Sequence, residues 1–497
     1  MNKQLKIGWA EVSITPDDRP VSLAGQFFER ISEYVESPIT ATAMAIENGD
    51  QKAVICSVDI VAIGENLMEM VRENVAKETD LDPMNVIIAA THSHTSHVYD
   101  RQGKPNAYNA KTVPILKRFL PEEAMYKPHA SSNEAMTPTE ALCFLVERIS
   151  KAVIDAWNNR KAASYACSFG RAAVGMCRRV TYNDGSAKMW GDANSATFVA
   201  MEGGNDSGIE ILYTFDENEN ITGVVANICC PSQVVEHRSF VSADYWGKVK
   251  EYLREHFGDK LYLLALGGPG GDQCPRDLVR WVQPETPIDD PNIERPYPLD
   301  RRADGSMFDI QGIKRIGRRV AHEIIMAYED REVPENADMF KHECVMVDLP
   351  IRRVTPAEYE ASVEAIRAFA KENGAKPISY VEKARLYIYA GNIARYEYQH
   401  NHDMETIETH HIRLGDIAFT TNPFELFLDY GNQIRARSYA KQTFIIQLCC
   451  GAYGYLPTEK AEKAGHYSAY ISSGAVGHEG GDLLVRKALE TINGFFK

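Results

Sequence analysis

The stretch VIIAATHSHTSH, residues 86–97, joins an apolar run to three closely spaced histidines. The apolar run predicts a buried strand that delivers the histidines at its end. Side chains alternate along an extended chain, so His92 and His94 are expected to project from one face and to share a cation or a substrate. Neutral imidazole is a common ligand of zinc-like metals. The stretch therefore predicts a metal or catalytic site, in preference to a polar loop whose histidines have separate partners.

The sequence around this stretch predicts an α/β architecture. Residues 41–46, 53–60 and 85–90 are expected to form strands, and residues 66–77 have the apolar spacing of a helix. Strands that alternate with helices are typical of sheets covered by helices. We find no internal repeat and no low-complexity linker in the chain.

Two long polar segments, about 100–138 and 275–302, interrupt the regular pattern. Loops of this length inside a domain are usually lids or binding loops. A third segment, about 356–394, is rich in Ala, Glu and Lys and predicts a solvated helix pair packed on the core.

Composition and charge restrict the partners of the chain. Its 497 residues are 44% hydrophobic and 25% charged, which predicts a globular protein with a large core. The net charge of −15 disfavours nucleic acids and anionic membrane surfaces as partners. We therefore expect a small-molecule substrate bound in a pocket. A chain of this size is also compatible with a homodimer.

The first residues of the chain and its cysteine content predict the cellular compartment. Residues Met1 to Lys6 are polar and do not form the apolar core of a secretion signal, and no stretch is apolar enough to span a membrane. The ten cysteines, which include two adjacent pairs, lack the density of a disulfide scaffold. A cytoplasmic location is expected.

Other chemically active residues lie far from the histidines in sequence. Cys230 ends a strand-like run and precedes Asp244 by fourteen residues. The run GGPGGDQCP, residues 267–275, allows close approach of the backbone to a ligand but lacks the GK[ST] of a phosphate-binding loop. Further on, Glu425 follows a strand-like run at 417–421.

In their order and spacing these features resemble the catalytic domain of the neutral (alkaline, non-lysosomal) ceramidases, a family of zinc amidases and less characterised relatives. The resemblance covers nearly the whole chain at low identity. It rests on GWAEVSITP at 8–16, THSH at 91–94, the spacing of Cys230 and Asp244, PFE at 423–425, and Tyr455 with Tyr467. It implies one catalytic domain over residues 1–497, with mixed sheets, surrounding helices and no C-terminal β-sandwich domain.

The resemblance implies a zinc site of two histidines, one glutamate and one tyrosine. His92, Glu425 and Tyr455 match three of these positions, and the second histidine position falls on Cys230. A thiolate is a good zinc ligand, so Cys230 is the expected replacement. Alternatively Cys230 is a small buried residue and His237 or His97 supplies the ligand, or the metal is lost and the pocket has been reused.

The family also uses residues that activate the substrate. His94 matches the second histidine of the string, Tyr467 matches the tyrosine, and Arg178 or Arg179 lies where the arginine is expected. The serine position falls on Cys274. This second substitution argues against simple retention of ceramide hydrolysis.

The expected function is a zinc-dependent hydrolase that acts on an amide or a cyclic ester of a small polar, carbohydrate-derived metabolite. A metal with an open position lowers the pKa of bound water to about 7. His94 would act as the base or orient the carbonyl, and Tyr467 with the arginine would stabilise the oxyanion. Arginines in the 275–302 loop, with Trp281, suit a polar or anionic substrate.

Three other functions remain open at this point. One is lyase, isomerase or glycosidase chemistry on a sugar or sugar acid, in which His94 and Tyr467 transfer protons. A second is a metallo-β-lactamase-like hydrolase, whose HxHxDH motif the string HSHTSH resembles except that Ser96 replaces the aspartate. A third is a non-catalytic binding protein.

Overall fold

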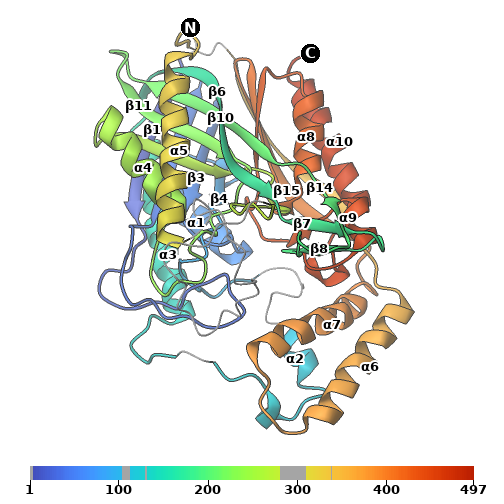
Figure 1. The fold of residues 1–497 in the computed structure, drawn as a ribbon. Coiled ribbons are helices and arrows are strands. Elements are labelled where there is room, and N and C mark those ends of the chain that lie inside the picture. Colours follow the sequence, from blue (N-terminus) through green and yellow to red (C-terminus); the bar gives the residue numbers. More distant parts are fainter. Residues whose placement is uncertain (1–3, 103–111, 129–130, 280–308, 337–338) are drawn as a thin grey trace.

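A computed structural model describes residues 4–102, 112–128, 131–279, 309–336 and 339–497. Within these residues, each of the three larger sheets repeats one connectivity. Three antiparallel strands form a meander, a helix follows, a fourth strand runs parallel to the third, and a second helix closes the unit. Figure 1 shows these sheets side by side with their helices on the outside.

The three units account for most of the chain. The first contains β1 (Lys6–Ser13), β2 (Thr40–Asn48), β3 (Gln51–Val58), α1 (Glu65–Glu78), β4 (Val86–Ala90) and α3 (Pro138–Asn158). The second contains β6 (Ser164–Cys177), β10 (Asp206–Phe215), β11 (Ile221–Ile228), α4 (Asp244–Phe257), β12 (Tyr262–Gly267) and α5 (Asp309–Glu329). The third contains β14 (Phe340–Pro350), β15 (Met404–Leu414), β16 (Ile417–Thr421), α8 (Leu428–Arg437), β18 (Gln442–Ile446) and α10 (His478–Gly494).

Shorter elements extend or connect these units. β5 (Lys161–Ala162) pairs with β1, and β13 (Gln273–Cys274) pairs with β6. A small sheet consists of β7 (Arg179–Tyr182), β8 (Ala187–Met189) and β9 (Phe198–Met201), and a two-stranded one of β17 (Glu425–Leu426) and β19 (Tyr455–Leu456). The remaining helices are η1 (Pro83–Asn85), α2 (Thr112–Leu116), η2 (Glu122–Ala124), α6 (Pro356–Asn373), α7 (Tyr380–Tyr398), α9 (Glu459–Ala464) and η4 (Ile471–Ser473).

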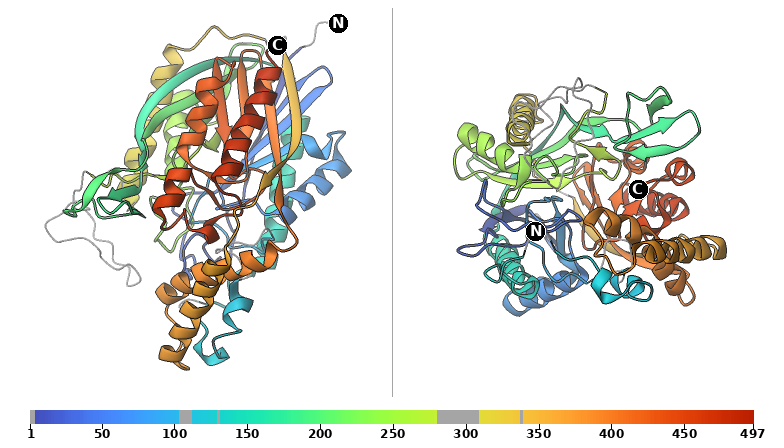
Figure 2. Two further views of the ribbon diagram at one scale, coloured as in Figure 1. Left: turned by 90° about the vertical axis from the view of Figure 1, so that its right-hand side faces the viewer. Right: turned by 60° about the horizontal axis from the view of Figure 1, so that its bottom comes forward.

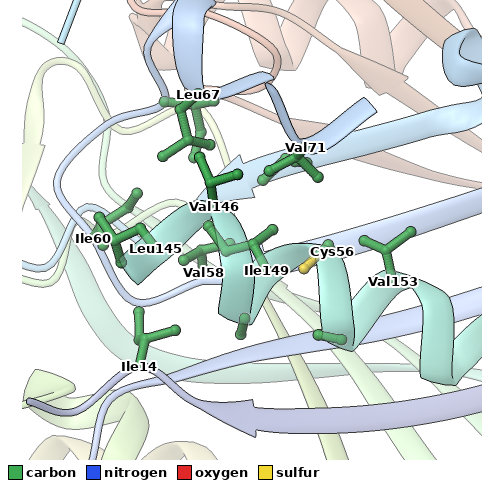
Figure 3. Packing of buried hydrophobic residues seen from close by; sticks show 14 of the residues in the cluster. Ile14, Cys56, Val58, Ile60, Leu67, Val71, Leu145, Val146, Ile149 and Val153 are labelled. Atoms are coloured by element: carbon green, nitrogen blue, oxygen red, sulfur yellow. The ribbon is translucent and has the colours of Figure 1, made fainter. Parts of the chain in front are cut away.

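The sheets form one central core and three outer ones. Inward-facing residues of all three sheets meet in a shared apolar cluster, in which Ile55, Leu264 and Phe419 are fully buried. The opposite face of each sheet is covered by its own helix pair. Between the first sheet and its helices, Val58 packs with Leu145 and neighbouring aliphatic side chains (Figure 3). Both faces of the parallel strands are therefore buried, which explains why β4 reads as a continuous apolar run.

The observed elements confirm the predicted α/β class. The predicted strands at 41–46, 53–60 and 85–90 correspond to β2, β3 and β4, and the predicted helix at 66–77 lies within α1. The first long loop contains α2 and η2 in its described part. Most of the second loop, from residue 280 to residue 302, lies outside the described residues.

The segment predicted as helical at 356–394 forms α6 and α7, and each begins with a complete capping box. The two helices pack on each other and on α2 around a cluster of their own, which includes Leu116, Ile366 and Ile393. This small helical region lies at one end of the sheets (Figures 1 and 2). Arg395 of α7 joins the pair to the rest of the chain by donating to the carbonyl of Ile471 in η4.

Two general expectations can be compared with the described residues. No helix in the described ranges has both the length and the apolar composition needed to cross a membrane. All ten cysteines are described and none forms a disulfide.

Candidate active site

The candidate site lies where the parallel strands of the three units end. His92 and His94 follow β4, Gln233 follows β11, and Glu425 follows β16. Parallel strand pairs of this kind place their carboxyl ends at one edge, where ligands commonly bind in open α/β sheets. The repeated connectivity thus brings together loops that are more than 300 residues apart in sequence.

His92 is held in a specific ring state. Its φ of 65° lies in the left-handed region, which non-glycine residues seldom adopt. The ring Nδ1 lies 2.7 Å from the carbonyl oxygen of Val61, which can only accept a hydrogen bond. Nδ1 therefore carries the proton, and Nε2 presents its lone pair to the site. Burial and the neighbouring His94 lower the pKa of His92 well below its ordinary value, which keeps the ring neutral.

Two side chains lie close to the Nε2 atom of His92. The Nε2 atom of His94 lies 3.2 Å away and an oxygen of Glu425 lies 3.6 Å away. Burial raises the pKa of Glu425, and Arg178 opposes this shift. Glu425 also hydrogen-bonds the side chain of Tyr455, its register partner in the β17–β19 pair.

His94 is positioned by the loop that follows β11. Its Nδ1 lies 3.2 Å from an oxygen of Glu236, and its Nε2 lies 3.2 Å from the amide nitrogen of Gln233. Burial raises the pKa of Glu236, but the contact with His94 outweighs this and leaves the pKa below its ordinary value. Gly25 has a φ of 96°, and a Cβ there would lie 2.4 Å from the His94 ring. A glycine at position 25 is therefore needed for the ring to occupy its place.

Arg178 connects several parts of the site. Its guanidinium donates to Gln233 Oε1 at 3.1 Å and to the carbonyl oxygen of Gly271 at 3.1 Å. It also lies 3.4 Å from the hydroxyl of Tyr455. Because Gln233 accepts from Arg178 through its oxygen, its amide nitrogen is the atom that faces His94.

Tyr467 and Arg179 lie beside this group. The rings of Tyr455 and Tyr467 meet edge to face, with centroids 5.6 Å apart. Arg179 is fully buried, pairs with Glu202 at 2.5 Å, and donates to the backbone carbonyl of Tyr467 at 2.9 Å. Arg178 thus faces the site, and Arg179 holds the chain that carries Tyr467.

The two cysteines predicted for this site are buried, and each thiol faces a backbone carbonyl. The Cys230 thiol donates to the carbonyl of Val174 at 3.3 Å and lies in the apolar cluster of the second unit. Burial, reinforced by Cys274, raises the pKa of the Cys230 thiol well above its ordinary value. The Cys274 thiol faces the backbone carbonyl of Arg276 at 3.1 Å. A ligand role for Cys230 and a substrate-activating role for Cys274 stay predictions.

The two alternative histidines have other partners. His97 is buried beside Phe144, and its Nε2 lies 2.8 Å from the carbonyl oxygen of Ile14. His237 lies 3.9 Å from Asp309. The contacts of His97 and His237 are therefore with other residues than His92 and Glu425.

Two acceptors face each other in the site. His92 Nε2 presents a lone pair, and an oxygen of the Glu425 carboxylate lies 3.6 Å from it. The lone pair of His94 Nε2 accepts from the amide of Gln233. Two acceptors this close repel each other, and a cation between them removes this repulsion. Imidazole and carboxylate are ligands that zinc accepts, so His92 and Glu425, with Tyr455 beside them, fit a zinc ion.

A second group of ligand-type side chains lies elsewhere. Within the described part of the chain, Cys344, Glu408 and His410 bring one ligand atom each within 4.8 Å of one another. Cys344 and His410 were not among the site residues predicted from the sequence.

The fold is that of the neutral ceramidases. No protein-family model and no curated protein matches the sequence. Among solved structures, the neutral ceramidase from Pseudomonas aeruginosa superposes with a TM-score of 0.64 at 15% identity, over 99% of this chain and 74% of that one. A ceramidase complexed with C2 superposes with a TM-score of 0.63 at 13% identity, over 99% of this chain and 75% of that one. The structural resemblance predicted from the sequence is thereby confirmed.

Sequence reasoning missed the residues that position the predicted ones. Gln233 and Glu236 contact His94, and neither belongs to a motif with a known spacing. Trp190 also went unnoticed, although the guanidinium of Arg276, one of the arginines in the 275–302 loop expected to suit a polar or anionic substrate, lies over its ring at 5.6 Å. The run CPSQVVEHR, residues 230–238, was the available signal, because it packs polar and charged residues directly after a buried strand.

Proposed function

We propose that this protein is a zinc-dependent hydrolase that cleaves an amide or a lactone in a small polar metabolite. The observation that carries the proposal is the approach of His94 Nε2, at 3.2 Å, and of the Glu425 carboxylate, at 3.6 Å, to the Nε2 atom of His92. The ceramidase fold supports hydrolysis as the reaction class, since ceramidases are zinc amidases. His92, Glu425 and Tyr455 would hold the ion, and Cys230 remains a candidate for a fourth ligand.

The side chains around the ion suit an attack of water on a carbonyl. A bound zinc ion supplies Lewis acidity, which makes water nucleophilic at neutral pH. His94 is placed to accept a proton at Nε2, and Glu236 next to Nδ1 stabilises the imidazolium that results. Tyr467 and Arg178 are placed to stabilise negative charge on the substrate oxygen.

The surroundings of Trp190 support a polar or anionic substrate. The guanidinium groups of Arg178 and Arg276 lie 5.9 Å and 5.6 Å from the centroid of this ring, and Trp190 is 38% exposed. Burial lowers the pKa of Arg276 to about 9, which still leaves it charged at neutral pH. Guanidinium groups bind carboxylates, and an aromatic ring stacks on a sugar. A carbohydrate-derived acid fits this combination.

One observation favours a second candidate function. The contact of His94 with the half-buried Glu236 resembles an acid–base pair that needs no metal. Lyase, isomerase or glycosidase chemistry on a sugar acid would use this pair together with Tyr467. Such a reaction would proceed equally well after zinc has been removed.

The two functions are separated by a substrate screen read by mass spectrometry. The zinc-loaded protein and its metal-free form are each incubated with sugar lactones, N-acyl amino sugars and sugar acids. The proposed function predicts products that gain one water molecule, in the zinc-loaded form only. His92→Ala should lose this activity, while the exposed His256→Ala keeps it. Products of unchanged mass, formed without metal, would instead support the isomerase.

A further inference from the structure

The seam between the first and third sheets contains a second group of ligand-type side chains. Cys344 on β14 is the register partner of His410 on β15. Glu408 precedes His410 by two residues and therefore projects from the same face of the strand. The ligand atoms of these three residues lie within 4.8 Å of one another. Strand register alone thus brings a thiol, a carboxylate and an imidazole together.

Cys450 adds a second thiol from another part of the chain. It follows β18, and its backbone amide donates to the carbonyl of Ile88 on β4 at 2.9 Å. Its thiol hydrogen-bonds the side chain of His410. Cys450 therefore lies beside the three-residue group, in contact with its imidazole, and is the candidate for a fourth ligand. Four protein ligands of these types are what closed, structural zinc sites use.

The neighbours of His410 orient its ring. Its Nδ1 lies 3.0 Å from His342 Nε2, and His342 Nδ1 lies 3.1 Å from the side-chain oxygen of Asn85. Because the Asn85 oxygen accepts, each ring donates from Nδ1 toward Asn85, and His410 Nε2 is turned toward the cluster. Nε2 donates to Glu408 Oε1 at 2.7 Å, and a metal ion bound at this nitrogen would replace that proton. Metal-bound histidines commonly have such an outer partner on the second nitrogen.

The charges of the cluster also suit a divalent ion. Arg72 on α1 donates to both oxygens of Glu408, at 2.6 Å and 2.9 Å, and to the carbonyl of Val86 at 2.9 Å. Two thiolates and one carboxylate carry three negative charges in total. A dication together with the Arg72 guanidinium balances them, so ion and ligands can be buried at little electrostatic cost. The carboxylate retains lone pairs for a metal while it binds Arg72.

We propose that Cys344, Glu408, His410 and Cys450 bind a structural zinc ion that is separate from the His92 site. The ion would join β14 and β15 of the third sheet to β4 and α1 of the first. Four protein ligands leave no open position, so this ion has no place for a substrate. Cys450 precedes Tyr455 by five residues, and the ion therefore also fixes the start of the turn that carries Tyr455 into the candidate active site.

The test uses the full chain with His92→Ala, which removes the other metal. Cobalt(II) is added and the excess is removed. We expect about one cobalt per chain, with the charge-transfer absorption that only a sulfur ligand produces. Adding Cys344→Ser together with Cys450→Ser should abolish this absorption and most of the bound metal. Cys143→Ser, which removes an exposed thiol on α3, is the matched control and should change neither.

Two results would overturn the proposal. One is a His92→Ala chain that binds no metal, and the other is sulfur-to-cobalt absorption that survives the removal of both thiols by Cys344→Ser and Cys450→Ser. X-ray absorption of the zinc-loaded His92→Ala chain gives an answer even if the cysteine variant does not fold. Sulfur neighbours at about 2.3 Å from zinc are expected, and a shell of nitrogen and oxygen alone would contradict the proposal. Neither measurement depends on whether the His92 site is catalytic.

Discussion

The Nε2 atoms of His92 and His94 lie 3.2 Å apart, while the Nδ1 atom of each ring faces an oxygen. Those oxygens belong to the backbone of Val61 and to the side chain of Glu236. The Val61 carbonyl places the proton of His92 on Nδ1, and the Gln233 amide, which donates to His94 Nε2, places the proton of His94 on Nδ1 as well. The lone pair of His92 Nε2 then faces the Glu425 carboxylate, and a cation between these two acceptors would remove their repulsion. The proposed function rests on this relationship.

Gln233 is expected to position His94 rather than to bind metal. It bridges Arg178 and His94, so Gln233→Leu should lower kcat by about 10- to 100-fold while zinc content stays constant. The pH profile of kcat should also shift, because the leucine no longer donates to His94 Nε2. The exposed Gln433→Leu is the control for a glutamine lost elsewhere. Loss of zinc from Gln233→Leu would assign Gln233 to the metal instead.

Cys230 distinguishes two forms of the zinc site. Its thiol donates to the Val174 carbonyl inside an apolar cluster, so we expect Cys230→Ala to keep its zinc and to lose about 1–2 kcal/mol of stability from packing. Zinc content and urea unfolding measure the two effects. If zinc is lost from Cys230→Ala although the variant is folded, the thiolate is the fourth ligand.

Much of the fold can be predicted from the sequence, because its first unit has clear periodicity. The buried runs of β2, β3 and β4 and the amphipathic α1 are recognisable locally. The repetition of the three units is not, since they share connectivity and no evident residue pattern. The docking of α7 also depends on tertiary contacts, such as those of the buried Arg395 with the backbone around η4.

The residues of the candidate site likewise comprise some that a local stretch of sequence predicts and others that it does not. His92 and His94 are predicted by a single local stretch, whereas Glu425, Tyr455 and Tyr467 depend on a resemblance across the whole chain. Contacts such as that between His94 and Glu236 arise from the meeting of separate loops. The Cys344 and His410 pair depends on strand register, which local patterns do not determine.

Arg395 is expected to be a major contributor to stability. This buried side chain on α7 donates to backbone carbonyls that include those of Ile471 at 3.0 Å and Ala475 at 2.8 Å. Arg395→Met leaves these acceptors without a donor and should lower the free energy of unfolding by about 3–5 kcal/mol. The exposed Arg353, which pairs with Asp403, serves as the control, and Arg353→Met should cost less than about 1 kcal/mol. Similar losses in both variants would contradict this role.

The raised pKa of the buried Asp244 carboxyl predicts that the stability of the protein depends on pH. Burial raises its pKa from 3.8 to about 7, against the opposing hydrogen bonds from Val235 and Tyr245. The folded state therefore binds more protons than the unfolded state between these values, and stability falls as the pH rises from about 4 to about 7. The contribution is up to about 4 kcal/mol.

Asp244→Asn removes this titration, and asparagine tolerates the left-handed φ of 55° at this position. Urea unfolding at several pH values should therefore give a flatter profile for the variant than for the parent. Parallel profiles would show that Asp244 is already ionised at low pH in the folded protein.

Measuring the zinc content of the protein by elemental mass spectrometry tests the central claim most directly. The comparison is made in the Cys344→Ser background, so that only the His92 site contributes. We expect about one zinc per chain, and nearly none when His92→Ala is added. His256→Ala should leave the content unchanged. A folded Cys344→Ser chain that takes up no zinc when zinc is offered, or one that keeps its zinc after His92→Ala, would contradict the account.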